Sequence, residues 1–207
     1  MSARPAVASD VAFTPTVKSL QTLRGSRRAY AHMERSGSWQ TRITPDLAEL
    51  IAAQRSVFLA TVNGDGYPYI QHRGGPPGFV RVLDEQTLAF VDFAGNRQFI
   101  STGNLLDNPK AHLFLIDYEQ RLRVKIWGEA RMLEATEEWL SRLMPEGYDA
   151  KPEQILLFNV QAWDANCPRH IPQRFDAEDV VAALGAKDER IAQLEAELAR
   201  LRAGDAG

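Results

Sequence analysis

The sequence predicts a mainly β protein of the α+β type, in which antiparallel strands close into a barrel and short helices are inserted between them. Three observations predict this fold class. Six or seven segments are rich in β-branched and aromatic residues or alternate with period two. Tight turns with Gly, Pro or Asn join neighbouring segments, as in antiparallel hairpins. Finally, VFLATV (57–62) and ILLF (155–158) are apolar on both faces, whereas the strands of a one-sided open sheet would alternate.

The N-terminal part, residues 1–43, is predicted to be an extension of the barrel. Residues 1–16 lack periodicity and contain two prolines, which is typical of a flexible arm. From Val17 to Met33 apolar residues recur at helical spacing and arginines cluster, which indicates a basic helix. This helix would pack on a partner or present a solvated basic face.

The barrel domain is predicted to span residues 44–175. Thr44 and Pro45 begin a helix that should end near Arg55. The turn Asn63-Gly64-Asp65-Gly66 then joins the first two strands. The predicted strands are 57–62, 67–72, 79–83, 87–91, 111–118, 121–133 and 155–163, with further helices at 97–106 and 135–143.

Residues 176–207 are predicted to form a helical tail, with a helix from Asp188 onward. Apolar side chains recur every seven residues at Leu184, Ile191 and Leu198, with Leu194 and Leu201 at the intervening position. Such a short coiled-coil segment is not stable alone in water. We therefore expect it to pack on the barrel or to pair with another subunit.

The composition limits the classes of partner. With 24 basic and 27 acidic residues the net charge is -3, which argues against general nucleic-acid binding. No apolar run approaches the roughly 20 residues of a membrane span, and the first residues lack the apolar region of a signal peptide. The single cysteine, Cys167, is typical of a reducing compartment. We expect a cytoplasmic protein without nucleic-acid or membrane partners.

Polar residues gather at two predicted strand ends, although none of the usual nucleophile, zinc or nucleotide-binding motifs is present. Gln71–Gly74 ends one strand, and Asp92–Gln98 leaves another and enters a helix. The free N–H groups of that helix, with Asn96 and Arg97, favour a phosphate. Ser101, Thr102 and Asn104 continue this polar face. The alternative is an ordinary N-capped helix with a surface arginine, which local physics alone favours. The four histidines are dispersed, and no metal site is predicted.

The order of these segments resembles the flavin-binding split-barrel family typified by pyridoxamine 5'-phosphate oxidase. The resemblance covers roughly residues 55–174, and its best-matching stretches are D-G-Y-P-Y-I-Q-H-R-G-G, F-V-D-F-A-G-N-R-Q, N-L-L-D-N-P-K-A-H-L-F-L and R-V-K-I-W-G-E-A-R. It implies a six-stranded antiparallel split β-barrel. It also implies a homodimer with two FMN molecules at the subunit interface.

The resemblance further implies roles for individual residues. Gln71–Gly74 matches the segment against the flavin ring and ribityl chain, and Val91-Asp92 matches a pair at the ribityl or phosphate region. Asn96-Arg97-Gln98 matches the family's Ser-Arg-Lys, which grips the FMN phosphate. Arg73 could replace the charge that is missing at Gln98. Arg123 falls where the family often has a Gln near the ring. The implied cofactor set is Gln71, His72, Arg73, Gly74, Val91, Asp92, Asn96, Arg97, Gln98, Ser101, Asn104, Arg123 and, from the second subunit, Trp163 and Arg174.

Two departures from the family pattern concern the substrate. Pro76-Pro77 stands where the oxidase has the Lys that holds the substrate phosphate, and the C-terminal Trp…Arg-x-His-x-Arg pattern is only loosely present between Trp163 and Arg174. We therefore expect an FMN-dependent oxidoreductase for a small molecule other than pyridoxamine phosphate, with NAD(P)H as a candidate electron donor. The alternatives are a non-catalytic flavin-binding, flavin-sensing or interaction protein, and a barrel that holds a deazaflavin or haem.

Overall fold

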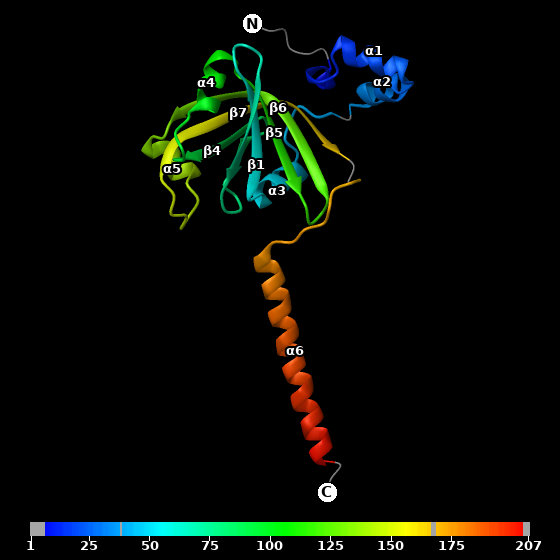
Figure 1. Ribbon diagram of the computed structural model, residues 1–207, viewed down its shortest axis with the longest axis vertical. Coiled ribbons are helices and arrows are strands. Elements are labelled where there is room, and N and C mark those ends of the chain that lie inside the picture. Colours follow the sequence, from blue (N-terminus) through cyan, green and yellow to red (C-terminus); the bar gives the residue numbers. More distant parts are fainter. Residues whose placement is uncertain (1–6, 38, 167–168, 205–207) are drawn as a thin grey trace. The chain divides into compact units, whose positions relative to one another are not determined.

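The computed structural model describes residues 7–37, 39–166 and 169–204. Within these residues seven antiparallel strands form one curled sheet in the order β2-β1-β5-β6-β7-β4-β3 (Figure 1). The strands are β1 Ser56–Val62, β2 Pro68–Gly74, β3 Arg81–Asp84, β4 Thr87–Phe93, β5 Lys110–Asp117, β6 Leu122–Glu134 and β7 Pro152–Asn166. The helices are η1 Ala8–Val11, α1 Pro15–Leu23, α2 Arg27–Ser36, α3 Pro45–Ala53, α4 Ile100–Asp107, α5 Glu137–Leu143 and α6 Ala177–Gly204.

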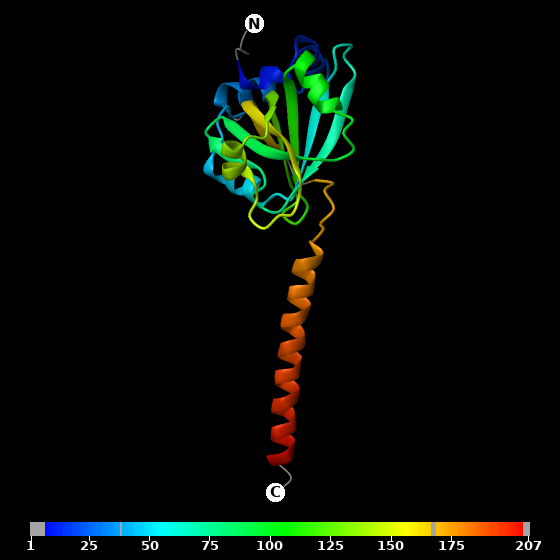
Figure 2. The same cartoon turned by 90° about the vertical axis from the view of Figure 1, so that its left-hand side faces the viewer.

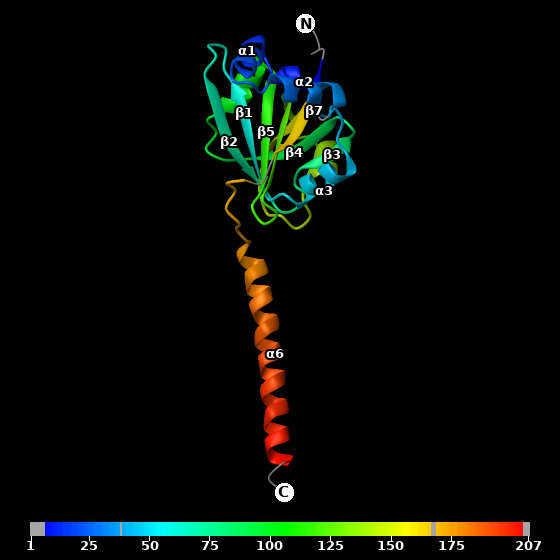
Figure 3. The same cartoon turned by 90° about the vertical axis from the view of Figure 1, so that its right-hand side faces the viewer.

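The predicted α+β class and its antiparallel barrel are confirmed. The described residues hold seven strands instead of the six that the resemblance implies, because the short β3 pairs with β4 at one edge of the sheet. At the opposite side β2, β1 and β5 follow one another across the sheet (Figure 3). The helix α3 lies beside β3. It begins where the Thr44-Pro45 pattern predicts, and Thr44 Oγ1 accepts a hydrogen bond from the Leu47 N–H.

The core explains why the central strands are apolar on both faces. Leu88 and Phe90 of β4 point into the barrel, where they meet side chains of β1, β5, β6 and β7. Ala89 and Val91 point to the other side and pack with Leu143 of α5 in a second cluster. Since α5 covers the outside of β4 and β7, these strands are buried on both faces.

The N-terminal segment differs from the predicted arm and single helix. Residues 8–11 form a turn of 3-10 helix, and the predicted helix over 17–33 is two helices, α1 and α2, separated at Gly25, whose φ of +79° ends α1. Aromatic side chains hold the segment on the barrel: Phe13 packs against Tyr30 and Trp39, and Trp39 stacks on Trp127 of β6 at 4.8 Å.

A second compact unit consists of Tyr118–Arg121 and the residues from Arg169 onward. Within it the Arg174 guanidinium lies over the Tyr118 ring at 4.6 Å. The tail helix α6 is continuous over 28 residues (Figure 2) and begins well before Asp188, the predicted start. None of the described helices is both long and apolar enough to span a membrane. The predicted lone thiol, Cys167, lies outside the described residues.

Gly128 allows β6 and β7 to approach closely at a β-bulge. A Cβ at this position would lie 2.0 Å from the Asn159 carbonyl oxygen and 2.5 Å from the Phe158 ring. The Gly128→Ala variant should therefore lose about 3 kcal/mol of unfolding free energy, and its Tm should fall by about 6–12 °C in thermal denaturation.

Gly103→Ala is the matched control, because no atom lies within 4 Å of its Cβ position in α4. It should be neutral or stabilise by about 0.5–1 kcal/mol. Equal melting temperatures for the two variants would contradict the close approach of β6 and β7.

Candidate functional site

The helix α4 covers the seam between β2 and β4, two strands that the sheet order places far apart. Side-chain hydrogen bonds hold it there, and each joins α4 to a different strand. Ser101 Oγ donates to Gln71 Oε1 on β2 (3.1 Å), Asn104 Nδ2 donates to Thr61 Oγ1 on β1 (2.9 Å), and Thr102 Oγ1 donates to Gln154 Oε1 on β7 (2.9 Å). The predicted polar face of this helix therefore points inward to the barrel.

A polar pocket of about 170 Å³ lies at this seam. Two sequence segments that are separated by about twenty residues line it together, the end of β2 and the loop from β4 into α4. Seven of the fourteen predicted cofactor residues belong to its lining: Gln71, Arg73, Asp92, Asn96, Arg97, Gln98 and Ser101. The structure thus brings together half of the predicted set.

An ion pair joins β2 to β4 inside the pocket. Arg73 Nη1 lies 3.0 Å from Asp92 Oδ1, and both side chains are largely buried. Burial raises the pKa of Asp92, and the nearby Glu153 carboxylate adds to this effect, while the charge of Arg73 opposes it. The Nε of Arg73 is buried and has no hydrogen-bond partner among the described residues. This N–H can therefore still donate a hydrogen bond to an anionic ligand.

Arg97 has an exposed guanidinium and an unfavourable backbone conformation. Its φ is +57°, and that of Phe99 is +52°, which places two non-glycine residues of one loop in the left-handed region. Such conformations cost about 1–3 kcal/mol each and are concentrated at ligand sites. Arg97 Nε lies 3.0 Å from Glu153 Oε1, and the side chain is 69% exposed.

The start of α4 is not capped by its own N-cap residue. Phe99 occupies the N-cap position and makes no side-chain hydrogen bond to the helix. The Asn96 side chain instead accepts from the Gln98 N–H at 3.2 Å, within the loop. Because the first N–H groups of a helix carry a partial positive charge, this end of the pocket favours an anion.

The other predicted cofactor residues lie elsewhere. Val91 is buried in the second core cluster, and Asn104 is buried behind the pocket on Thr61. Trp163 packs against the barrel core, and its Nε1 donates to the Arg42 carbonyl oxygen at 2.7 Å. Arg174 belongs to the second compact unit.

His72, Gly74 and Arg123 lie on the outer face of the sheet. This face follows from the register: Phe58 pairs with His72 and Phe114, and Ile116 pairs with Arg123. The His72 Nε2 lies 2.6 Å from Ser56 Oγ. The outer face of β2, β1, β5 and β6 consists of Ile70, His72, Gly74, Ser56, Phe58, Ala60, His112, Phe114, Ile116, Arg123, Lys125 and Trp127. It is mainly aromatic and aliphatic.

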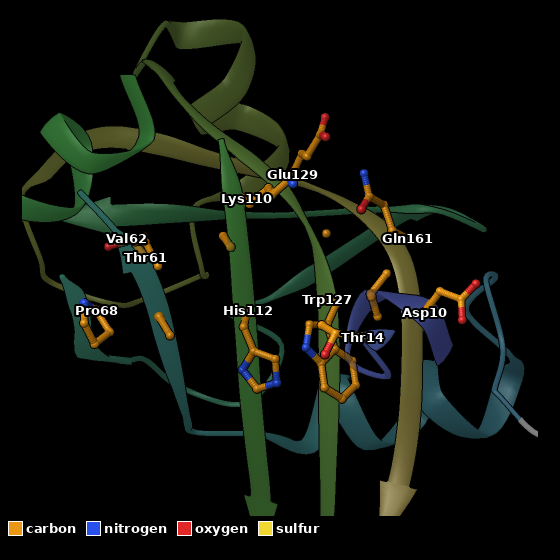
Figure 4. Close-up of a pocket in the computed structure, with 14 residues that line it drawn as sticks. Asp10, Thr14, Thr61, Val62, Pro68, Lys110, His112, Trp127, Glu129 and Gln161 are labelled. Carbon is orange, nitrogen blue, oxygen red and sulfur yellow. The ribbon is translucent and has the colours of Figure 1, made fainter. Parts of the chain in front are cut away.

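A larger cavity of about 570 Å³ lies on this outer face, under the N-terminal segment. His112 and Trp127 form its wall from neighbouring strands, with their rings 4.8 Å apart, and Asp10 of η1 and Thr14, the N-cap residue of α1, also line it (Figure 4). The sequence patterns predicted no site here, because residues distant in the chain contribute to it.

Glu153 is the main pocket residue that the sequence patterns missed. It lies on β7, about 55 residues after Arg97 in the chain, and lines the pocket together with Arg73 and Arg97. The register of β4 with β7, in which Asp92 pairs with Gln154, brings it there. Among the described residues no group of His, Cys, Asp and Glu side chains could hold a metal ion.

The family model for pyridoxamine 5'-phosphate oxidase matches residues 43–167, more than half of the chain. The chain therefore belongs to the pyridoxamine 5'-phosphate oxidase family. Similar solved structures include a putative pyridoxamine 5'-phosphate oxidase from Lactobacillus delbrueckii, with 19% identity over 60% of this chain and 94% of that chain and a TM-score of 0.47. An FMN-binding protein from Syntrophomonas wolfei has 13% identity over 72% of this chain and 97% of that chain, with a TM-score of 0.46. An F420 reductase has 17% identity over 58% of this chain and 98% of that chain, with a TM-score of 0.42. A search of curated proteins finds no match.

His112 should make stability depend on pH. Burial lowers its pKa to about 4, and Lys125 adds to this effect, so the folded state binds its proton less readily than the unfolded state, where the pKa is about 6.5. The contribution of His112 to the unfolding free energy should be constant above pH 7, fall from about pH 6.5 to about pH 4, and level off below. Denaturant unfolding at several pH values would measure this.

A His112→Gln variant provides the comparison. The carboxyl groups titrate alike in both proteins, so the difference in unfolding free energy between them isolates the histidine. That difference should change with pH only in the window from about 4 to 6.5. A difference that is the same at pH 7.5 and pH 4.5 would contradict the lowered pKa.

Proposed function

We propose that this protein is an FMN-binding flavoprotein and that the polar pocket between β2, β4 and α4 holds the cofactor phosphate. The observation that carries the proposal is the buried Nε of Arg73, which has no acceptor among the described residues and lies in a pocket that also contains the start of α4, where Phe99 provides no side-chain cap. A buried charged donor without an acceptor is unfavourable, and a phosphate oxygen would satisfy it. Membership of the pyridoxamine 5'-phosphate oxidase family supports the same cofactor.

The charges in the pocket fit one phosphate group. Arg73 and Arg97 supply two cationic side chains, and Asp92 and Glu153 oppose them. Arg73 contacts Asp92 through Nη1, so its buried Nε, without a partner among the described residues, remains for a phosphate oxygen. Since about 170 Å³ is less than the roughly 300–1,000 Å³ of pockets that enclose drug-sized ligands, the flavin ring would lie outside this pocket.

The bound cofactor would supply electron transfer to or from a small substrate. The residues of this chain would bind and orient it. Arg73 and Arg97 would hold the phosphate, and Gln71 and Ser101, already hydrogen-bonded to each other, would present amide and hydroxyl groups to the ribityl chain. Gly74 at the end of β2 would leave the backbone open to the ring.

The outer sheet face supports a homodimer with the cofactor at the subunit interface. Phe58, Phe114 and Ile116 lie half-buried on this face, and Ile70 there is 62% exposed. Exposed apolar area of this kind favours contact with another surface. Arg123 lies on this face with a buried Nε that lacks a partner among the described residues, so it could serve a ring that is bound across the interface.

The substrate we propose is a small molecule other than pyridoxamine phosphate, with NAD(P)H as a candidate electron donor in the cytoplasm. Pro76 and Pro77 stand where the family resemblance places a phosphate-binding Lys, and neither can bind an anion through its side chain. The same departure favours a flavin-binding or flavin-sensing protein without turnover as the second candidate. Oxidation of NAD(P)H by the FMN-loaded protein would distinguish the two functions.

FMN titration of the purified protein tests the cofactor assignment. Arg97→Ala should raise the Kd for FMN about 10- to 150-fold, because it removes one charged hydrogen bond worth about 1.5–3 kcal/mol. Glu153→Gln should lower the Kd, since it removes a negative charge that opposes the phosphate. Quenching of flavin fluorescence would give both values.

Arg131→Ala is the control, because Arg131 is an exposed arginine on β6 that does not line the pocket. It should leave the Kd unchanged. The phosphate assignment would be wrong if both arginine variants weakened binding equally. Retention of a deazaflavin or haem, but not FMN, would overturn the cofactor assignment itself.

The Ile70→Asp variant tests whether the outer sheet face forms the dimer interface, because it places a charge at an exposed apolar position of that face without disturbing the core. FMN binding should weaken at least about tenfold if the site is completed by a second subunit. Leu106→Asp is the control, since Leu106 on α4 is 84% exposed and lies outside the outer sheet face. Equal FMN affinity for both variants would contradict an interfacial site.

A further inference from the structure

The tail helix α6 presents an apolar stripe to solvent that is interrupted once, at Lys187. The side chains of this stripe are 41–62% exposed: Val180, Leu184, Ile191, Leu194, Leu198 and Leu201. They recur with the three- and four-residue spacing of a heptad seam over about three heptads. A solvated polar helix would not expose such a stripe, so the structure lacks the surface that covers it.

The heptad positions follow from this stripe. With Leu184, Ile191 and Leu198 at position a, position d is occupied by Val180, Lys187, Leu194 and Leu201. The flanking e positions are then Asp188, Glu195 and Arg202, and the g positions are Arg190 and Glu197. In coiled coils the charges at e and g determine partner and orientation.

These charges match those of a second copy in parallel orientation. In a parallel pair each g residue meets the e residue five positions later on the other helix. Arg190 then meets Glu195 of the second copy, and Glu197 meets Arg202, so that each pair has opposite signs and occurs twice in the dimer. Lys187, the single charged d residue, meets Lys187 of the second copy in the same layer, and Asp188 of the second copy lies beside it and offsets this repulsion.

An antiparallel pair of the same helices is less favourable. There g residues meet g residues and e residues meet e residues. With Ile191 opposite Leu194, Arg190 would meet Glu197, which is attractive, but Asp188 would meet Glu195, which is repulsive. Lys187 would face the apolar Leu198. The charge pattern therefore favours the parallel arrangement.

We propose that α6 pairs with α6 of a second copy of this chain as a parallel two-stranded coiled coil. The proposal does not depend on flavin binding, because its surface consists only of the tail helix. If the barrels of the two copies also pair, the pairing of their tail helices takes place within one dimer. The effective concentration of one tail helix for the other then reaches the millimolar range for a short linker. A seam of about three heptads that is too weak alone would then be formed in most molecules.

Cysteine cross-linking in the full chain tests the pairing and its direction. In a Cys167→Ser background, Leu201→Cys places one thiol in a d layer, where the two copies of a parallel pair lie within disulfide range. Mild oxidation should convert most of this variant to a disulfide-linked dimer. The control Ala196→Cys, at the outward f position, should remain monomeric on non-reducing gels.

Charge exchange gives an independent test with its own rescue. Arg190→Glu places like charges opposite each other twice in a parallel dimer and should weaken pairing about fivefold. Adding Glu195→Arg restores opposite signs in the parallel arrangement, so the double variant should cross-link through Leu201→Cys as well as the parent. In an antiparallel pair the double variant would recover as well, because Glu195→Arg then faces Asp188. The rescue therefore tests the e and g charge pairs, and the Leu201→Cys cross-link alone decides the direction of the helices.

Circular dichroism and FMN titration of the same variants show whether the barrel is intact. Cross-linking that is equal for Leu201→Cys and Ala196→Cys, or absent from both while the barrel remains folded, would overturn the proposal. Failure of FMN binding with cross-linking retained would contradict the proposed function alone. Cross-linking of Leu201→Cys without rescue in the double variant would overturn the proposed pairs of charges at e and g.

Discussion

The ion pair between Arg73 on β2 and Asp92 on β4 is the interaction on which the candidate site depends. These strands share no backbone hydrogen bonds, since β1, β5, β6 and β7 separate them in the sheet, yet the two charged groups are 3.0 Å apart and largely buried. Removing either partner would leave a buried charge without compensation, at a cost of about 3–5 kcal/mol. The pair therefore holds together the two strand ends that line the pocket.

The seam closed by this pair is also the place where the barrel is polar inside. α4 covers it through hydrogen bonds from Ser101 and Asn104, in addition to the apolar packing of Leu105 in the core. The loop that leads into α4 contains two non-glycine residues, Arg97 and Phe99, whose backbone φ is positive and lies in the left-handed region. A fold selected only for stability would avoid both features, so the polarity and the strain point to ligand binding at this seam.

Much of the barrel could be predicted because its signals are local. The Asn63–Gly66 turn and the alternation of 57–62 determine one hairpin, and Thr44-Pro45 determines the start of α3. The prediction of one helix over 17–33 was wrong, because Gly25 adopts a positive φ that interrupts it and apolar spacing alone does not reveal this. Glu153 was missed for a different reason: the register of β7 on β4 places it beside Arg97, and no local pattern records that register.

The sequence by itself determined the class of fold, the segments at the two polar strand ends, the heptad seam of the tail and the family resemblance. These features depend on residues that are close together in the chain, where spacing and turn chemistry decide the outcome. Only the tertiary structure decided which polar residues meet. It placed Arg73 on Asp92, buried Val91 and Asn104 away from the pocket, and directed His72 and Arg123 to the outer face. Strand register and the curl of the sheet make these choices, because a shift of one residue exchanges the two faces of a strand.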